Sequence, residues 1–179
     1  EYGQTEQLIR QLLGEPGSPR NELADMTPTE LTTPETYLGY RQAENFASPG
    51  EADFGHPQTY DVPERLSLNQ WALSGDWTLQ SGASVLNGIE GRIAFRFHAR
   101  DVHLVLGPPA QGVSVPFQVL VDGAPPGDAH GLDVDEQGRG AVAQQRLYQL
   151  VRQRGPIADR TFEVVFQAPG VEAYVFTFG

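Results

Sequence analysis

Several aromatic residues and arginines are the side chains of this sequence best suited to hold a ligand. Trp71, Trp77, Tyr148 and Tyr174 carry flat rings of the kind that stack on the C–H face of a sugar. Planar polar groups such as guanidinium and amide can clasp the hydroxyls of the same ligand. The sequence therefore predicts a binding site for a carbohydrate-like ligand. Its predicted members are Trp71, Trp77, Arg100, Asp122, Arg146, Tyr148 and Arg152.

Burial in the core is the alternative for each aromatic ring of this set. Tryptophan and tyrosine in strands usually lie inside the protein. Trp71 and Trp77 flank a predicted tight turn at residues 74–76, so at most one of the two is expected to be exposed.

The segment 146–153 carries the predicted polar part of the site. Strand alternation places Arg146, Tyr148 and Arg152 on one face. If that face is exposed, two guanidinium groups beside a tyrosine suit an anionic or hydroxyl-rich ligand. If Tyr148 is a core residue, this hypothesis weakens. The proline-containing loop 123–131 is the expected neighbour of the site.

Covalent and hydrolytic chemistry have little support. The chain has no cysteine, so a thiol nucleophile, a disulfide and a cysteine-bound zinc are excluded within it. Ser74 lacks the G-x-S-x-G setting of a nucleophilic serine. The acidic residues around 122–136 lie in turns, where aspartate is common for backbone reasons rather than as an acid–base pair. We predict a non-catalytic chain without a cofactor; glycoside hydrolysis is the catalytic alternative.

Two patterns suggest a metal, and neither is complete. His98 and His103 lie on consecutive predicted strands and supply half of a site that needs three or four ligands. Residues 133–138 resemble the opening of a calcium loop, but the twelfth position is Gln144 instead of glutamate. We predict solvent-facing histidines, a tight turn and no metal ligand, although a structural calcium remains open.

Alternating apolar residues dominate the rest of the chain. Ile93, Phe95 and Phe97 face one way, for example, while Arg92 and the other even positions to His98 face the other. Glycine (20) and proline (14) are abundant, as in chains with many turns. The predicted fold is all-β, an antiparallel β-sandwich or jelly roll of roughly eight strands with one short N-terminal helix. The predicted strand segments are 69–80, 91–99, 102–106, 113–121, 146–153, 161–167 and 173–178.

The first residues differ from the rest. Leu8, Ile9, Leu12 and Leu13 form the apolar face of a predicted helix over 4–13, and a proline-rich stretch follows. A net charge of −11 argues against nucleic acid and anionic lipid as partners. No apolar run reaches the ~20 residues that span a bilayer.

Five short motifs are spread along the chain: Thr-Pro-Glu-Thr-Tyr-Leu-Gly (33–39), Trp-Ala-Leu-Ser-Gly-Asp-Trp (71–77), Phe-His-Ala-Arg-Asp-Val (97–102), Leu-Tyr-Gln-Leu-Val-Arg (147–152) and Phe-Thr-Phe-Gly (176–179). Together they resemble the C-terminal module of bacterial thiol–disulfide proteins of the DipZ type, in which a β-sandwich similar to carbohydrate-binding modules follows a thioredoxin-like domain.

The resemblance implies a division of the chain into three parts. Residues 1–14 are then the closing helix of a preceding thioredoxin-like domain, 15–36 a linker and 37–179 the sandwich. It also implies an extracytoplasmic location, with a membrane tether elsewhere in the parent protein and no membrane contact by this part.

Two functions are compatible with these expectations. The first is a non-catalytic accessory module that docks the thioredoxin-like domain, its partner in cis, on envelope carbohydrate or on a glycosylated or client protein. The second is a structural or protein-interaction domain that forms a homodimer or recognises clients without binding sugar.

Overall fold

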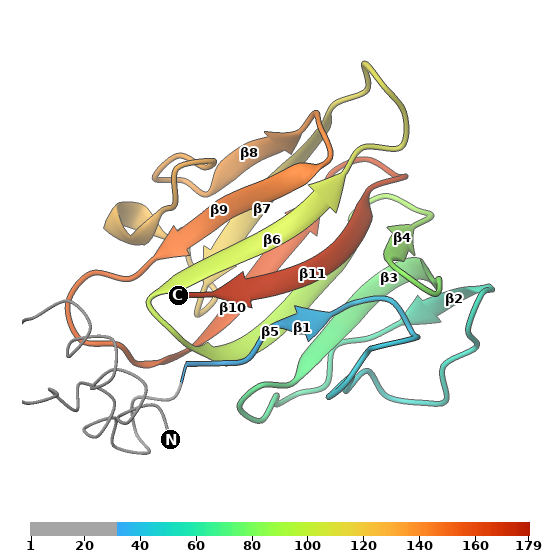
Figure 1. Cartoon of the computed structure of the whole chain (residues 1–179), viewed down its shortest axis with the longest axis horizontal. Helices are drawn as coiled ribbons and strands as arrows, with labels where there is room; N and C mark the ends of the chain where they lie inside the picture. Colours follow the sequence, from blue (N-terminus) through green and yellow to red (C-terminus); the bar gives the residue numbers. More distant parts are fainter. Residues whose placement is uncertain (1–31) are drawn as a thin grey trace, which may run out of the picture. The chain divides into compact units, whose positions relative to one another are not determined.

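A computed structural model describes residues 32–179, which fold into an all-β sandwich (Figure 1). The predicted helix over 4–13 and most of the predicted linker lie outside the described residues. Within 32–179 no helix is long and apolar enough to cross a bilayer. The strands are β1 (Thr36–Tyr37), β2 (Pro57–Tyr60), β3 (Trp71–Leu79), β4 (Ser84–Leu86), β5 (Arg92–His98), β6 (Asp101–Gly107), β7 (Val115–Val121), β8 (Arg139–Val142), β9 (Arg146–Arg152), β10 (Asp159–Phe166) and β11 (Glu172–Phe178), with a 3-10 turn at Gly127–Ala129.

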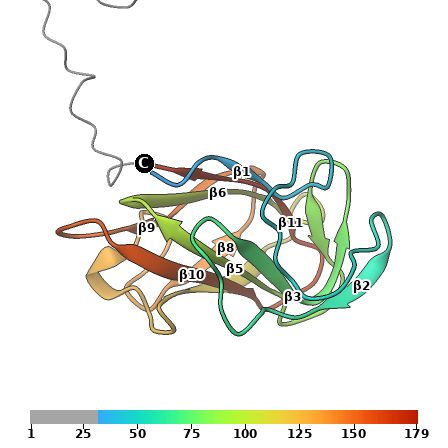
Figure 2. The same ribbon diagram turned by 90° about the horizontal axis from the view of Figure 1, so that it is seen from below.

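The strands form two layers that share β3. One layer has the order β2-β3-β4-β11-β6-β9, with β1 added on β11; the other has the order β8-β7-β10-β5-β3. All of these pairings are antiparallel. Figure 2 shows the layer of β6 and β11 above that of β10, β5 and β3. The predicted antiparallel sandwich is confirmed.

The core lies between the layers and is filled from alternate strand positions. Phe95 on β5 and Phe162 on β10 point inward and pack edge to face on Phe176 of the opposite layer, with ring centroids 5.0 and 5.7 Å apart. Burying side chains of this size stabilises the fold by about 1.5–3 kcal/mol each. Strand alternation therefore leaves the even positions of β5 on the outer face of its layer.

Strand β3 corrects the prediction of a tight turn at residues 74–76. The strand is continuous: its first half pairs with β5 and its second half with β2 and β4. Gly75 has a φ of +96°, a conformation that suits glycine, and it bends the strand from one layer into the other. Because alternation continues through the bend, Trp71 and Trp77 both point into the core.

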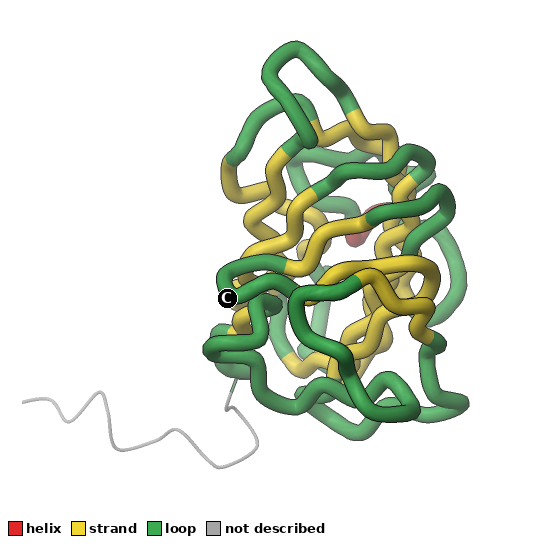
Figure 3. Tube along the Cα trace, turned by 90° about the vertical axis from the view of Figure 1, so that its right-hand side faces the viewer, coloured by secondary structure: helices red, strands yellow, loops and turns green. Residues whose placement is uncertain are grey.

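The sandwich includes residues that the sequence analysis assigned to the linker. Thr33 accepts a hydrogen bond from the His98 N–H through its hydroxyl (2.8 Å) and donates its own N–H to the His98 carbonyl (2.9 Å). Loops connect the strands at the ends of the layers (Figure 3). One of them, residues 61–70, follows β2 and returns over the outer face of β5 to reach β3.

Candidate ligand-binding groove

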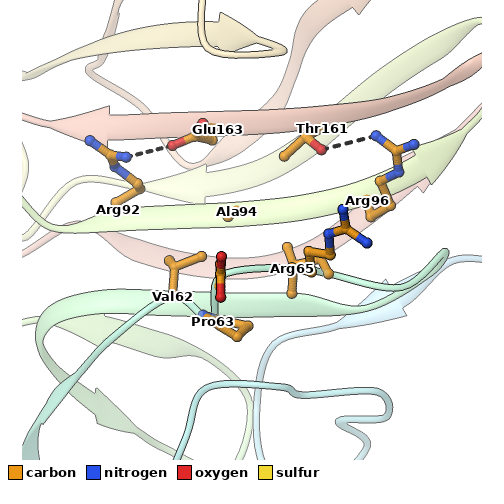
Figure 4. Close-up of a pocket in the computed structure, with 10 residues that line it drawn as sticks. Val62, Pro63, Arg65, Arg92, Ala94, Arg96, Thr161 and Glu163 are labelled. Atoms are coloured by element: carbon orange, nitrogen blue, oxygen red, sulfur yellow. Dashed lines mark hydrogen bonds and ion pairs between the residues drawn. The ribbon is translucent and has the colours of Figure 1, made fainter.

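A cavity of about 620 Å³ lies on the outer face of β5 and β10, beneath the first part of the loop 61–70 (Figure 4). We call it the arginine groove, and the loop segment 62–66 its strap. Its volume falls within the ~300–1,000 Å³ of small-ligand sites. The groove is lined by Val62, Pro63, Glu64, Arg65, Leu66, Arg92, Ala94, Arg96, Thr161 and Glu163.

The floor of the groove is low because its central residue, Ala94, has a small side chain. Ala94 on β5 lies between Ala72 on β3 and Glu163 on β10 in the strand register. Arg92 and Arg96 occupy the outward-facing positions of β5 on either side of Ala94, and their backbone positions are about 13 Å apart along the strand. The long arginine side chains therefore form the two ends of a depression over Ala94 (Figure 4).

The strap forms the opposite wall, and residues 69–70, which follow it in the same loop, are tied to β5 by backbone hydrogen bonds. The Asn69 N–H donates to the Arg96 carbonyl (2.7 Å), and the Arg96 N–H donates to the Gln70 carbonyl (3.0 Å). Pro63 has a fixed φ and no N–H, which suits an extended segment outside a sheet. The strap holds its apolar side chains half-buried and leaves Glu64 and Arg65 exposed.

The two ends of the groove differ in charge pairing. Arg92 forms an ion pair with Glu163, with 2.6 Å between Nη1 and Oε2. Arg96 instead donates to the neutral Thr161 hydroxyl at 3.2 Å. Within residues 32–179 Arg65 has neither an ion pair nor a side-chain hydrogen bond, and Figure 4 shows it on the Arg96 side of the groove. One end therefore presents a neutral pair, and the other presents guanidinium groups without a carboxylate bonded to them.

The three aromatic residues of the predicted site are core residues, which corrects that part of the prediction, whereas Tyr174 is half-buried. Trp71 and Trp77 are fully buried, and their indole N–H groups donate to the carbonyls of Glu44 (2.9 Å) and Ser74 (2.8 Å). Tyr148 is 1% exposed, with the Arg146 guanidinium 3.9 Å above its ring. None of the three rings has a free face for a ligand.

Two of the four charged residues of the predicted site meet at one carboxylate, and the other two are paired elsewhere, so the four do not form one site. Arg100 and Arg152 both approach the carboxylate of Asp101, at 2.9 and 3.7 Å. Asp122 pairs with Arg160 at 2.9 Å, and Arg146 pairs with Asp133 at 2.8 Å. Arg146 and Arg152 lie at opposite ends of β9, about 20 Å apart. Asp122 and loop 123–131 do border a second cavity of about 380 Å³, with neither of these two arginines in its lining.

The pKa of Asp133 is lowered by its partners. Partial burial would raise this pKa, but hydrogen bonds from Arg146 and the Gln149 N–H, with the charges of Arg146 and His103, outweigh it. A carboxyl group whose pKa is lower in the folded state stabilises the fold above its unfolded pKa of about 4 and loses this effect as the pH falls through the folded value. Asp133 is thus an ionised structural residue at neutral pH.

The residues of the two predicted metal patterns bond to protein groups and do not converge on an ion. His98 on β5 bonds to Asp159 at 2.7 Å, while His103 lies on β6 in the other layer, so the two histidines do not meet. Asp135 accepts the N–H groups of Gln137 and Arg139 (both 2.9 Å), the pattern of a tight turn. Among residues 32–179 no three acidic or histidine side chains gather in a way that could hold an ion.

The residues of the groove are not among those predicted from the sequence. Arg92, Ala94 and Arg96 do lie on one predicted strand face, and two arginines flanking an alanine were the available signal. Tyr40 and Phe54, whose rings stack at 5.0 Å between centroids and which are 41% and 52% exposed, were not predicted either. Both sets depend on loops without a periodic pattern.

Comparison with known proteins finds similar chains. The chain is 34% identical over 114 residues to Protein DipZ of Mycobacterium bovis and of Mycobacterium tuberculosis, covering 60% of this chain but only 16% of theirs. A family two carbohydrate esterase from Clostridium thermocellum, solved with cellohexaose, is similar over 55% of this chain and 27% of its own, at 14% identity and a TM-score of 0.40. The model of the family "Thioredoxin like C-terminal domain" matches residues 33–179, so the chain belongs to that family.

Proposed function

We propose that this domain is a carbohydrate-binding accessory module of a DipZ-type thiol–disulfide protein and that the arginine groove holds the sugar. In this proposal the module acts outside the cytoplasm and brings a thioredoxin-like domain to envelope glycan or glycosylated clients. The observation that carries the proposal is the groove itself: an open cavity of about 620 Å³ with polar side chains around a floor of alanine.

The chemistry of the lining supports a ligand rich in hydroxyl groups. A sugar hydroxyl both donates and accepts hydrogen bonds. The Arg92–Glu163 pair offers guanidinium donors and carboxylate acceptors side by side, and Thr161 adds a hydroxyl. No aromatic side chain lines the groove, so hydrogen bonds must provide most of the affinity.

Arg92→Gln is expected to weaken glycan binding about tenfold or more, because a charged hydrogen-bond donor is worth about 1.5–3 kcal/mol. Affinity electrophoresis in gels containing xylan, galactomannan, arabinogalactan or polygalacturonate measures the effect. Arg139→Gln on β8 is the control, since Arg139 is exposed and lies outside the groove. Far-UV circular dichroism verifies that both variants are folded. Absence of retardation by every one of these glycans with the unmodified protein would reject the proposed function.

A second candidate is self-association through the outer face of the other layer. Tyr37, Val175, Val105 and Leu147 are direct register partners across β1, β11, β6 and β9, and all four point outward. They form an apolar row across the layer at the front of Figure 1. A two-fold dimer could bury this row against its copy, since such an interface uses one patch twice.

Val105→Glu tests this candidate. If the row forms a dimer, a charge in its centre is expected to convert the dimer to monomer, because an unpaired carboxylate resists burial. Light scattering after size exclusion measures the mass. Val113→Glu, on an exposed loop outside the row, is the matched control. A monomer in the unmodified protein at all concentrations would eliminate this candidate and leave the carbohydrate proposal unaffected.

A further inference from the structure

The arginine groove gathers positive charge in a chain that is otherwise acidic. Its lining contains three of the chain's 12 basic residues, Arg65, Arg92 and Arg96, and two glutamates, whereas the whole chain carries 23 acidic residues. The Arg92–Glu163 ion pair cancels one charge of each sign. Arg65, Arg96 and Glu64 remain, which leaves a net positive charge.

Arg96 keeps unused hydrogen-bonding capacity. A guanidinium group has five N–H donors, and the one side-chain hydrogen bond of Arg96 among residues 32–179 goes to the Thr161 hydroxyl. Asp122 is the acidic group near it, but its carboxylate already accepts from Arg160 Nη1 and from the Thr161 N–H, both at 2.9 Å. Arg96 therefore remains able to bind an added oxyanion.

Arg65 is held near Arg96 by the turn that follows the strap. This turn closes through two hydrogen bonds between residues 67 and 70: the Ser67 N–H donates to the Gln70 side chain (2.9 Å), and the Gln70 N–H donates to the Ser67 carbonyl (3.0 Å). This turn is in turn bonded to the backbone of Arg96 itself. The two guanidinium groups thus belong to segments fixed to each other, although their side chains have no common carboxylate.

We propose that Arg65 and Arg96 bind an oxyanion carried by a sugar, so that the ligand of the groove is an acidic glycan bearing carboxylate or phosphate groups. This inference rests on the proposed carbohydrate function and adds the chemical class of the sugar. The planar fork of arginine matches both anions through paired hydrogen bonds. The Arg92–Glu163 end then contacts neutral hydroxyls of the same chain of sugars.

The test compares each acidic oligosaccharide with a neutral counterpart of the same sugar. Isothermal titration uses hexagalacturonate against its methyl ester, and mannohexaose 6-phosphate against mannohexaose; the two acidic probes separate carboxylate from phosphate. We expect at least one acidic oligosaccharide to bind at least about tenfold more tightly than its neutral counterpart. Arg65→Gln and Arg96→Gln are each expected to remove this difference, because they lower the affinity for the acidic probe much more than the affinity for its neutral counterpart. Glu64→Gln, which removes a negative charge from the lining, is expected to increase the affinity for the acidic probe.

The controls keep this inference separable from the proposed function. Arg65 is exposed and has no partner within the described residues, so its replacement is not expected to disturb folding, and Arg139→Gln removes a positive charge outside the groove. If each acidic probe binds no more tightly than its neutral counterpart, the acidic-glycan inference is overturned and the carbohydrate function is preserved. Binding of none of these probes, together with no retardation by the polysaccharides above, would remove both.

Discussion

Trp77→Ala is expected to lower the free energy of unfolding by about 3–5 kcal/mol and to leave the glycan affinity of the folded protein unchanged. The ring is fully buried, packs on Phe166 at 6.1 Å between centroids, and donates its N–H to the Ser74 carbonyl. Removal leaves a cavity beside β3 and an unsatisfied carbonyl. Urea unfolding followed by far-UV circular dichroism measures the loss.

Phe54→Ala is the control for Trp77→Ala, because Phe54 is an exposed aromatic residue whose main partner is the Tyr40 ring. Its loss is expected to cost only about 1 kcal/mol, the value of an exposed aromatic pair. A Trp77→Ala protein as stable as the unmodified one, but unable to bind glycan, would contradict the assignment of this tryptophan to the core.

The long strands were predictable because their pattern is local. β5, β6, β7, β9, β10 and β11 each have seven or eight residues, enough for several repeats of inward and outward positions. β1 has two residues and β4 has three, and such lengths carry no period. These short strands form because a neighbouring strand supplies their hydrogen bonds. They depend on tertiary structure, so the local sequence does not predict them.

The burial of Tyr148 could not be predicted for a related reason. Alternation groups Arg146, Tyr148 and Arg152 on one side of β9, but it does not say whether that side faces the second layer. Tyr148 faces inward, and its hydroxyl accepts from the Ala143 and Gln144 N–H groups and donates to the Gln144 carbonyl at 2.7 Å. From the sequence alone, a tyrosine whose hydroxyl bonds to the backbone of a loop cannot be told from one whose hydroxyl binds a ligand.

The groove could be predicted only in part. Its floor follows from the alternation of β5, which already placed Arg92, Ala94 and Arg96 together. Its strap does not, because the return of the loop over β5 depends on hydrogen bonds between residues 69–70 and Arg96, which are far apart in sequence. For this groove, the path of the loop was harder to predict from the sequence than the strands were.

Gly138→Ala is expected to destabilise the domain by about 2–5 kcal/mol, through backbone strain and a clash with β7. Gly138 has a φ of +79°, which costs a residue with a Cβ about 1–2 kcal/mol. The added Cβ would also lie 2.1 Å from the Val119 carbonyl oxygen, and neither backbone can move freely because the Val119 N–H donates to the Gly138 carbonyl at 2.7 Å. Relieving such overpacking costs a further amount of about 1–3 kcal/mol.

Gly112→Ala separates the strain at Gly138 from the clash. Gly112 has nearly the same φ, +81°, but no atom lies within 4 Å of the position its Cβ would take. Its replacement should cost only the conformational part, about 1–2 kcal/mol. Urea unfolding of both variants gives the difference, and equal losses would mean that the segment carrying Gly138 can move away from β7. The turn at Asp135 and the pairing of β8 with β7 both adjoin Gly138. A large loss of unfolding free energy for Gly138→Ala, but not for Gly112→Ala, would therefore show that backbone contact fixes this end of the sandwich, independently of any ligand in the groove.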